Sequence, residues 1–443
     1  MIAVLLSCTS DRAPPTLASC DEADCVANLA SATWSGPPYE AKLGDALAVW
    51  DDLVFAGAPL YPRDPNHIGV SYVGVASLDR LEPVGRWLGI PERDELTGTS
   101  IAVDDLDGDG VPEVAIGQPS GHPVFDVDGA VYLVSGAPAG NVPLAEAAAL
   151  AFHGPDRTFV GNGVRFGHLF DGSTQLVTCG IGTGVADIPG VVYAIDPTRT
   201  GILDEDDALR TLRGPPGFGV DLAVGDLDAD GQDDLIVANG LEGVDWFLGP
   251  WDAAADEVDR DGAWSVGRAT GPIGDHIELV GDVTGDGAPD LGFTALTHLE
   301  PVERAGRAYV VAAGDPTSGS VEDLALQVQG RFVGEGVGSA IAGGDVDGDG
   351  QDDLVVGASG VYPGTFRGAV LLFLGPRDAA ALTADDADAR IQGEHVHDFF
   401  GRSLALVDAD GDARQDLLIG ATGWPSDQYR GAVYLVRGID WLP

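Results

Sequence analysis

Basic side chains are scarce in this sequence, whose 443 residues include 23 lysines and arginines against 71 aspartates and glutamates, a formal charge of −48. This sign of charge excludes nucleic-acid binding, which needs a basic surface. The chain also lacks any apolar run near the roughly 18 residues that span a bilayer, which excludes a polytopic membrane protein. The 64 glycines and 28 prolines exclude long helical bundles. The hydrophobic fraction of 44% is that of a globular protein and excludes a disordered acidic chain.

Cysteines are also few, and three of the four lie close to the N-terminus. The opening MIAVLLSC resembles the lipobox of bacterial lipoproteins, in which Cys8 would be cleaved and acylated. Residues 1–7 would then be a truncated signal-like segment without the usual basic region, and the alternative is an ordinary secretory signal. Residues 8–30 are predicted to be a polar linker. Within this linker Cys20 and Cys25 could form a short-loop disulfide in an oxidising compartment.

One acidic motif recurs along the chain. Its five copies are DDLDGDGVPEVAIG from Asp104, GDLDADGQDDLIVA from Gly225, GDVTGDGAPDLGFT from Gly281, GDVDGDGQDDLVVG from Gly344 and VDADGDARQDLLIG from Val407. The first motif aspartates are separated by 121, 56, 63 and 63 residues, so the first interval holds two periods of about 60. The regular spacing indicates a repeat protein.

Two further units keep the strands but have a shortened loop. The first is FGHLFDGSTQLVTCGIG, residues 166–182, in which Cys179 is predicted to be a buried small hydrophobe. The second is LGDALAVWDDLVFAGAP, one period upstream of the first motif. The chain therefore contains seven units.

Each unit has the composition of an antiparallel β-meander. A Gly/Phe turn leads into a short apolar strand, the acidic loop, a second strand such as DLLIG, a third such as GAVYLV, and a last one such as LQVQG. Four strands repeated seven times predict an all-β fold, a seven-bladed β-propeller over residues 31–443. The last unit ends at its third strand, so we expect the segment ATWSG at residues 32–36 to supply the missing strand and close the ring.

These units resemble FG-GAP repeats, the blades of the integrin α-subunit propeller and of many bacterial secreted proteins. The resemblance rests on the FG turns (FGHL, GFGVDL, GVGSAI and FFGRSL), the acidic loop and the GA-type strand taken together. It implies a propeller whose calcium loops join the first and second strands on one face. It does not specify a function, because the fold is used by adhesins, receptors and accessory domains alike.

The spacing D-x-D-x-D-G-x-x-D itself points to calcium. Positions one, three, five and nine aim oxygen ligands at one point, and a glycine at position six permits the sharp reversal. An EF-hand would need glutamate at position twelve and flanking helices, and here position twelve lies in a β-strand. We expect about five Ca²⁺ sites, in blades 2, 4, 5, 6 and 7. The predicted ligands are Asp105, Asp107, Asp109, Glu113, Asp226, Asp228, Asp230, Asp234, Asp282, Thr284, Asp286, Asp290, Asp345, Asp347, Asp349, Asp353, Asp408, Asp410, Asp412 and Asp416.

The alternative is that these loops are acidic hairpin turns, since Asp and Gly are common in turns. The sites should also differ among themselves. Thr284 replaces an aspartate in the fifth blade, Ala413 replaces the turn glycine in the seventh, and Glu113 takes position nine in the second. We therefore expect the sites of blades 4 and 6 to bind calcium most tightly.

The connections predicted for the opposite face are rich in aromatic residues and arginine, which describes a recognition surface held by a rigid scaffold. The aromatic residues of these connections are Tyr61, Phe125, Tyr362, Phe366, Trp424 and Tyr429. We expect all eight histidines in or beside these connections: His67, His122, His153, His168, His276, His298, His395 and His397. The alternative is that these aromatic side chains only cover the blade ends.

The leading hypothesis is an extracytoplasmic binding or adhesion module, secreted or anchored through a lipid on Cys8, that binds an unidentified protein or glycan on the face opposite the calcium loops. We expect no enzymatic activity, because the sequence contains no G-x-S-x-G, H-E-x-x-H or phosphate-binding loop. Two alternatives remain: a glycan-active lyase or hydrolase on a propeller scaffold, and a purely structural component of an envelope assembly.

Overall fold

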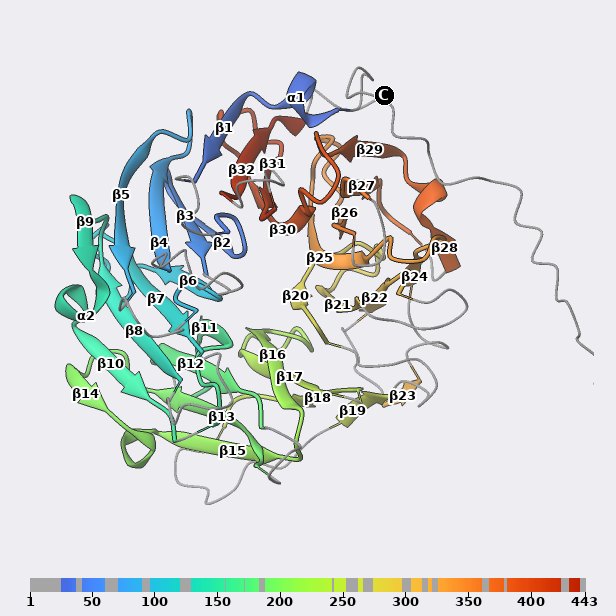
Figure 1. Ribbon diagram of the computed structural model, residues 1–443. Coiled ribbons are helices and arrows are strands. Elements are labelled where there is room, and N and C mark those ends of the chain that lie inside the picture. The colour runs from blue at the N-terminus through green and yellow to red at the C-terminus, as the bar shows by residue number, and fades with distance from the viewer. Residues whose placement is uncertain are drawn as a thin grey trace, which may run out of the picture.

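The chain forms a ring of seven β-sheets around a central axis (Figure 1), as the computed structural model shows. The structure describes residues 25–36, 42–59, 71–89, 96–119, 129–155, 157–170, 172–182, 188–240, 243–251, 262–265, 274–296, 304–312, 318–320, 326–360, 366–377, 381–423 and 430–438. Each sheet has at least four strands, and the first strand of each faces the centre of the ring. The predicted seven-bladed propeller is confirmed.

In blades 1 to 6 the four antiparallel strands of a blade come from one continuous stretch of the chain. In blades 1 and 2 they are β2 (Leu47–Trp50), β3 (Leu53–Ala58), β4 (Tyr72–Ser77) and β5 (Pro83–Leu88), then β6 (Ile101–Asp104), β7 (Glu113–Gln118), β8 (Ala130–Ser135) and β10 (Leu150–His153). In blades 3 and 4 they are β11 (Gly163–Gly167), β12 (Gln175–Gly180), β13 (Gly190–Ile195) and β15 (Arg210–Gly214), then β16 (Phe218–Gly225), β17 (Asp234–Asn239), β18 (Gly243–Phe247) and β19 (Gly262–Ser265).

The remaining three blades repeat this order. Blades 5 and 6 consist of β20 (Ile277–Leu279), β21 (Asp290–Ala295), β22 (Arg307–Ala312) and β24 (Leu326–Gln329), then β25 (Val337–Gly344), β26 (Asp353–Ala358), β27 (Ala369–Phe373) and β29 (Ala389–Gln392). Blade 7 consists of β30 (Phe400–Val407), β31 (Asp416–Ala421), β32 (Ala432–Val436) and, from the start of the chain, β1 (Ala32–Ser35).

The ring closes as the sequence predicted. Strand β1 pairs antiparallel with β32, and Ala32 lies opposite Leu435. The short helix α1 (Val26–Leu29) precedes β1, and Val26 is fully buried among residues of blades 6 and 7. Cys25, Val26, Leu29 and Ala30 thus contact the propeller, although the sequence placed them in a polar linker. Cys25 forms a parallel bridge to Gln392 and is disulfide-bonded.

The predicted bonding partner Cys20, like Cys8, lies outside the described residues. Cys179 is a free thiol and is fully buried, as predicted from its apolar run. Burial raises the pKa of this thiol well above its usual range, with a smaller contribution from Asp221. It is therefore a protonated, inert core residue.

Four blades have a fifth, outermost strand that the sequence did not predict. These strands are β9 (Gly140–Pro143), β14 (Gly201–Leu203), β23 (Gly319–Ser320) and β28 (Ala381–Thr383). Each comes from the connection between the third and fourth strands of a later blade, the next one along the ring, and pairs parallel with the outer strand of the blade before it. Each thereby covers a strand edge that would otherwise expose its backbone N–H and C=O groups.

The remaining helices are also short. They are α2 (Leu144–Ala147) and the 3₁₀ turns η1 (Glu205–Asp207) and η2 (Ala384–Asp386). Among the described residues, no helix has the length and apolarity needed to cross a membrane.

The hydrophobic core lies between the blades. Seven clusters of buried side chains in the described part of the chain occupy the seven seams between neighbouring sheets. A blade therefore buries both of its faces, which explains why second strands such as β31 are buried at every residue rather than alternating. This arrangement fixes each blade against two neighbours and leaves the loops at the two faces of the ring.

The start of blade 3 differs from the sequence prediction. The Phe166–Gly167 pair was interpreted as the turn that leads into the first strand, but it forms the end of strand β11. The turn itself is at Val160–Gly161, where Gly161 has φ +92° and its carbonyl accepts a hydrogen bond from Ser100 Oγ at 2.8 Å. Valine has replaced the phenylalanine of the repeat, so the FG pair six residues later was mistaken for it.

Candidate functional site

The five acidic loops lie between the first and second strands of blades 2, 4, 5, 6 and 7. In each loop three carboxylates offer oxygen atoms that all lie within 4.8 Å of one another. The groups are Asp105, Asp107 and Glu113; Asp226, Asp228 and Asp230; Asp282, Asp286 and Asp290; Asp345, Asp347 and Asp353; and Asp408, Asp410 and Asp416. The hard, anionic character of these donors fits a divalent cation bound by oxygen.

The position-one aspartate organises each loop through backbone hydrogen bonds. In blade 6, Asp345 Oδ1 accepts from Gly348 N at 2.6 Å and Oδ2 accepts from Gly350 N at 2.9 Å. In blade 7, Asp408 accepts from Gly411 and Ala413 in the same way, and these donors outweigh desolvation and lower its pKa. Asp408 is thus held as a carboxylate at the centre of its loop.

In blades 4 to 7 the position-nine aspartate is the buried acidic residue of the loop. Asp353 is 1% exposed; its Oδ2 accepts from Val346 N at 2.9 Å and its Oδ1 from Gly375 N at 2.9 Å. Asp234 has the same two bonds, from Leu227 N at 2.7 Å and Gly249 N at 2.6 Å. This carboxylate therefore joins the acidic loop to the segment that follows the third strand.

Burial raises the pKa of the position-nine aspartates in blades 4 to 7. The pKa of Asp234 and of Asp290 rises to about 6, mainly by desolvation, and the neighbouring carboxylates Asp228, Asp282 and Asp286 add to the rise. The pKa values of Asp353 and Asp416 are raised for the same reason. A buried carboxylate that is repelled by its neighbours is the arrangement that a bound cation would relieve.

Not every predicted ligand joins a cluster. The position-five residues Asp109, Asp349 and Asp412 each accept a hydrogen bond from the backbone N–H two residues later. In blade 4 the residue outside the group is Asp234, and in blade 5 the Thr284 hydroxyl donates to Asp290 Oδ1 at 3.0 Å. Whether these side chains become ligands stays a prediction.

The loops need a left-handed backbone at two positions, four and six, of which the sequence analysis identified only the second. In blade 6 both are glycines, Gly348 and Gly350, with φ of +82° and +85°. Ala413 occupies position six of blade 7 at φ +71°, which confirms the positive φ required there. Ala229 occupies position four of blade 4 at φ +61°. Blade 4, expected to hold one of the two tightest sites, therefore carries a strain that the sequence analysis did not consider.

Blade 3 shows what replaces the site when the acidic loop is lost. Gln175 takes position nine, is fully buried, and its Oε1 accepts from Leu169 N at 2.8 Å and Phe170 N at 3.3 Å. Its Nε2 donates to Ser173 O at 2.6 Å. A neutral amide thus accepts backbone N–H groups of the blade 3 turn, as Asp353 Oδ2 accepts from Val346 N in blade 6.

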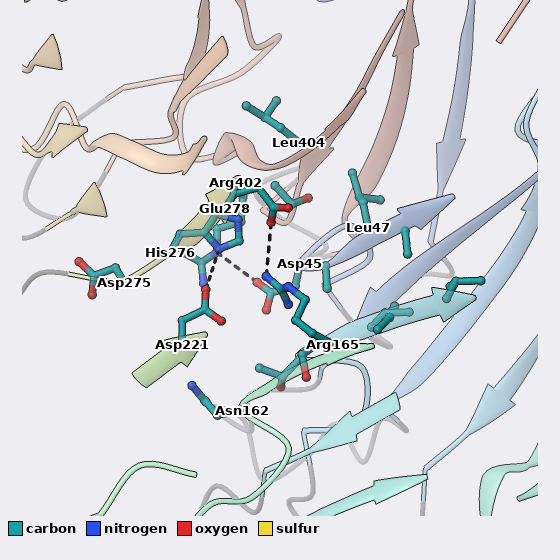
Figure 2. A pocket seen from close by; sticks show the side chains of 18 of the residues that line it. Asp45, Leu47, Asn162, Arg165, Asp221, Asp275, His276, Glu278, Arg402 and Leu404 are labelled. Atoms are coloured by element: carbon teal, nitrogen blue, oxygen red, sulfur yellow. Dashed lines mark hydrogen bonds and ion pairs between the residues drawn. The ribbon is translucent and has the colours of Figure 1, made fainter. Parts of the chain in front are cut away.

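A second feature is a cavity of about 560 Å³ at the centre of the ring, lined by residues of all seven blades (Figure 2). Most of its lining comes from the beginnings of the first strands, which run towards the acidic loops. The charged lining residues are Asp45, Asp104, Arg165, Asp221, Asp275, His276, Glu278 and Arg402. Carboxylates outnumber guanidinium groups, so the cavity is acidic overall.

Two ion pairs and one histidine–carboxylate contact organise this cavity (Figure 2). Arg165 lies 3.4 Å from Glu278, Arg402 lies 3.2 Å from Asp45, and His276 Nδ1 lies 3.3 Å from Asp221 Oδ2. Each pair joins two different blades.

The pKa values of the two buried aspartates of the cavity, Asp221 and Asp275, depend on burial and on the groups that contact each carboxylate. Asp221 also accepts from Ile277 N at 3.0 Å. Burial opposes ionisation of Asp221, but His276 and Arg165 outweigh it and lower its pKa. Burial instead raises the pKa of Asp275, whose Oδ2 accepts from Leu296 N at 2.7 Å.

The aromatic recognition surface predicted for the opposite face mostly lies outside the described residues, with Phe366 the exception. His67, His122 and His298 also lie outside them. His276, His395 and His397 lie in connections of that face and His153 lies beside one, at the end of β10, as predicted. The prediction for His168 is wrong: it follows β11 in the turn that corresponds to an acidic loop, where its N–H donates to Asp233 Oδ2 at 2.7 Å.

The cavity charges were not found from the sequence. They occupy the residues just before or within the first strands of different blades, so they are dispersed along the chain. The signal that could have found them is the repeat itself: alignment of the residue after each turn glycine brings together Asp45, Asn162, Asp275 and Arg402.

Comparison with known proteins agrees with the repeat. A model described as FG-GAP repeat matches residues 97–134, 337–373 and 400–436, which belong to blades 2, 6 and 7. Similar proteins include integrin alpha-7 of Rattus norvegicus (28% identical, 44% of this chain and 18% of the relative) and integrin alpha-X of Homo sapiens (37%, 26% and 10%). Phosphatidylinositol-glycan-specific phospholipase D of Rattus norvegicus is 31% identical over 46% of this chain and 26% of its own length. The chain thus matches about a quarter or less of each of these relatives.

Proposed function

Because the chain carries FG-GAP repeats and closes into a seven-bladed propeller like that of integrin α-subunits, we propose that it is a calcium-stabilised binding module without catalytic activity. The observation that carries this proposal is the convergence of carboxylate oxygens in five loops. Calcium accepts six to eight oxygen ligands in flexible geometry, whereas magnesium requires a strict octahedron that these irregular loops do not favour. Calcium would neutralise charge in the loops and hold the first strand to the second in each of these five blades.

A calcium titration of the full metal-free chain by calorimetry tests this assignment. We expect about five sites, and one fewer in the Asp345→Ala variant, which loses a central ligand. The control is Asp79→Asn, an exposed acid in a connection of blade 1 that should leave the number of sites unchanged. A wild-type chain that takes up no calcium contradicts the proposal.

We place the binding of a protein or glycan at the face opposite the acidic loops, around the central cavity. Two observations support this: the lining residues lie mostly at the beginnings of the first strands, and the carboxylates outnumber the basic groups. The cavity would therefore favour a ligand that presents positive charge. A pull-down from envelope fractions and a glycan array would identify it, with Asp275→Asn expected to weaken capture and Asp79→Asn to leave it unchanged. Equal capture by both variants would exclude the cavity.

The proposed location is outside the cytoplasm, secreted or anchored through a lipid on Cys8. The disulfide bond of Cys25 supports an oxidising compartment. Mass spectrometry of the mature chain tests the lipid, since an acylated Cys8 becomes the first residue. An unmodified chain that retains residues 1–7 contradicts the anchor.

A glycan-active enzyme is the second candidate, because one relative is named as a phospholipase that is specific for a phosphatidylinositol-glycan. The match covers 26% of that protein, so its activity does not transfer to this chain by similarity. Turnover of a panel of glycans and glycolipids by the purified chain, abolished by a substitution in the cavity, would replace the binding-module proposal with an enzymatic one.

A further inference from the structure

The acidic loops of neighbouring blades contact each other through the residue at position eight, directly before the buried position-nine ligand. In blade 6 this residue is Asp352, whose Oδ2 accepts a hydrogen bond from Asp282 N in the blade 5 loop at 2.8 Å. In blade 7 it is Gln415, whose N–H donates to Asp345 O in the blade 6 loop at 2.9 Å. The residue at position eight of one loop thus hydrogen-bonds to the residue at position one of the loop before it. The position-one residue is a predicted metal ligand.

A second contact runs in parallel between blades 5 and 6. Asp353 Oδ1 accepts from Gly375 N at 2.9 Å, and two residues later Arg377 N donates to Val283 O in the blade 5 loop at 2.9 Å. Val283 is fully buried, so this carbonyl has a fixed position. The buried carboxylate of the blade 6 site is therefore joined to the blade 5 loop along two routes, one through Asp352 and one through Gly375.

In the part of the chain that the structure describes, these links between acidic loops are absent where the sequence differs. Blades 2 and 5 carry proline at position eight, Pro112 and Pro289, which has neither a carboxylate nor an N–H to offer. In blade 4 Asp233 makes the equivalent contact, but to His168 N in the blade 3 turn, which lacks a described acidic group. The loops of blades 5, 6 and 7 thus form one connected series, whereas blade 2 stands alone.

We propose that Asp352 and Gln415 are positioning residues that couple the metal sites of blades 5, 6 and 7, so that filling the blade 6 site raises the calcium affinity of its neighbours. The physical reason is that a cation on Asp353 and Asp345 orders the residues that hold Asp282 in place. The blade 5 loop is then already partly ordered when its own ion binds, so this binding costs less conformational entropy. This inference rests on the proposed calcium binding.

The test uses the full chain and reads individual loops. Asp347→Ala removes a ligand of the connected blade 6 site, and its matched control Asp107→Ala removes the equivalent ligand of the isolated blade 2 site. Calorimetry counts sites and affinities, and hydrogen exchange with mass spectrometry follows the peptide over residues 281–290 with calcium present. For Asp347→Ala we expect one lost site, about fivefold or more weaker binding at the neighbours, and faster exchange over 281–290. For Asp107→Ala we expect one lost site and no other change.

A second pair of variants isolates the link. Asp352→Ala keeps every predicted ligand and should reduce the effect of Asp347→Ala on residues 281–290, whereas its control Asp233→Ala should not. If Asp347→Ala and Asp107→Ala each lose one site and leave the peptide 281–290 unchanged, the coupling is wrong while calcium binding stands. If the wild-type chain takes up no calcium, both the coupling and the proposed function fail.

Discussion

Trp34 in β1 lies directly opposite Val433 in β32, across the junction between the two ends of the chain. The indole is 7% exposed and packs between blades 7 and 1, where its ring occupies the space that a side chain at Gly74 would need. The N-terminal strand therefore fills a hydrophobic seam as well as completing a sheet.

Replacing Trp34 by alanine should lower the free energy of unfolding by about 3 kcal/mol or more, because it empties a buried site of aromatic size at the ring junction. The matched control is Thr33→Ala in the same strand, whose side chain faces solvent and should cost less than about 0.5 kcal/mol. Urea unfolding of the three proteins measures this. Equal stability of both variants would show that β1 does not close the ring.

Replacing Ala229 or Ala413 by glycine should make the chain more stable, since both residues adopt a left-handed backbone that alanine disfavours. We expect Ala229→Gly and Ala413→Gly each to stabilise the chain by about 0.5–1 kcal/mol, because relief of this strain exceeds the added entropy of the unfolded glycine. The reciprocal change Gly350→Ala should destabilise by a similar amount; there an added methyl group meets no atom within 4 Å, so only the φ of +85° matters. Thermal unfolding of the three variants and the wild-type chain measures whether each substitution stabilises or destabilises the fold.

The metal-free chain should be more stable near pH 5 than near pH 7.5. The folded pKa of Asp234 and of Asp290 is about 6, above the ordinary value of 3.8. Between these values the folded state holds more protons than the unfolded state, so stability falls as the pH rises through about 6. Calcium should reverse the trend, because it favours the ionised carboxylates. Calorimetric melting of dialysed and calcium-loaded chain at both pH values checks this, and a metal-free chain that is most stable at pH 7.5 would contradict it.

Gln175→Glu should destabilise blade 3 at neutral pH by about 2 kcal/mol, because it buries a charge and replaces the amide donor to Ser173 O with an acceptor. The loss should shrink as the pH falls and the new carboxyl becomes protonated. The variant's melting temperature from pH 5 to 8, relative to wild type, gives the measurement. If the difference in melting temperature between Gln175→Glu and wild type does not change with pH, the prediction is wrong, because the new carboxyl group would then be hydrated and not buried.

The sequence predicted the parts of the fold that repeat. Seven units, the acidic loops and the closing strand all follow from a period of about 60 residues, because every copy must bury the same faces against its neighbours. The fifth strands could not be predicted in this way. Strands β9 and β14 lie in connections of equal length, residues 136–149 and 196–209, whose sequences differ, and they form through backbone pairing that makes few demands on side chains.

The candidate site was predictable to the extent that it is local. Asp345 and Asp353 are eight residues apart in one turn, so their spacing alone brings them together. The contact of Asp282 with Asp352 joins residues 70 positions apart and depends on how two blades pack. The ion pair of Arg402 with Asp45 spans 357 positions and depends on ring closure. Contacts of this kind follow from the geometry of the ring and not from any motif.

The most direct test of the central claim is calorimetric unfolding of the full chain with excess calcium and with excess chelator. A cation that binds only the folded state stabilises it by about 2.7 kcal/mol for each site at a concentration one hundred times its Kd. We therefore predict a large fall in melting temperature on chelation, restored by calcium and not by an equal concentration of magnesium. An unchanged melting temperature would reduce the five loops to acidic turns.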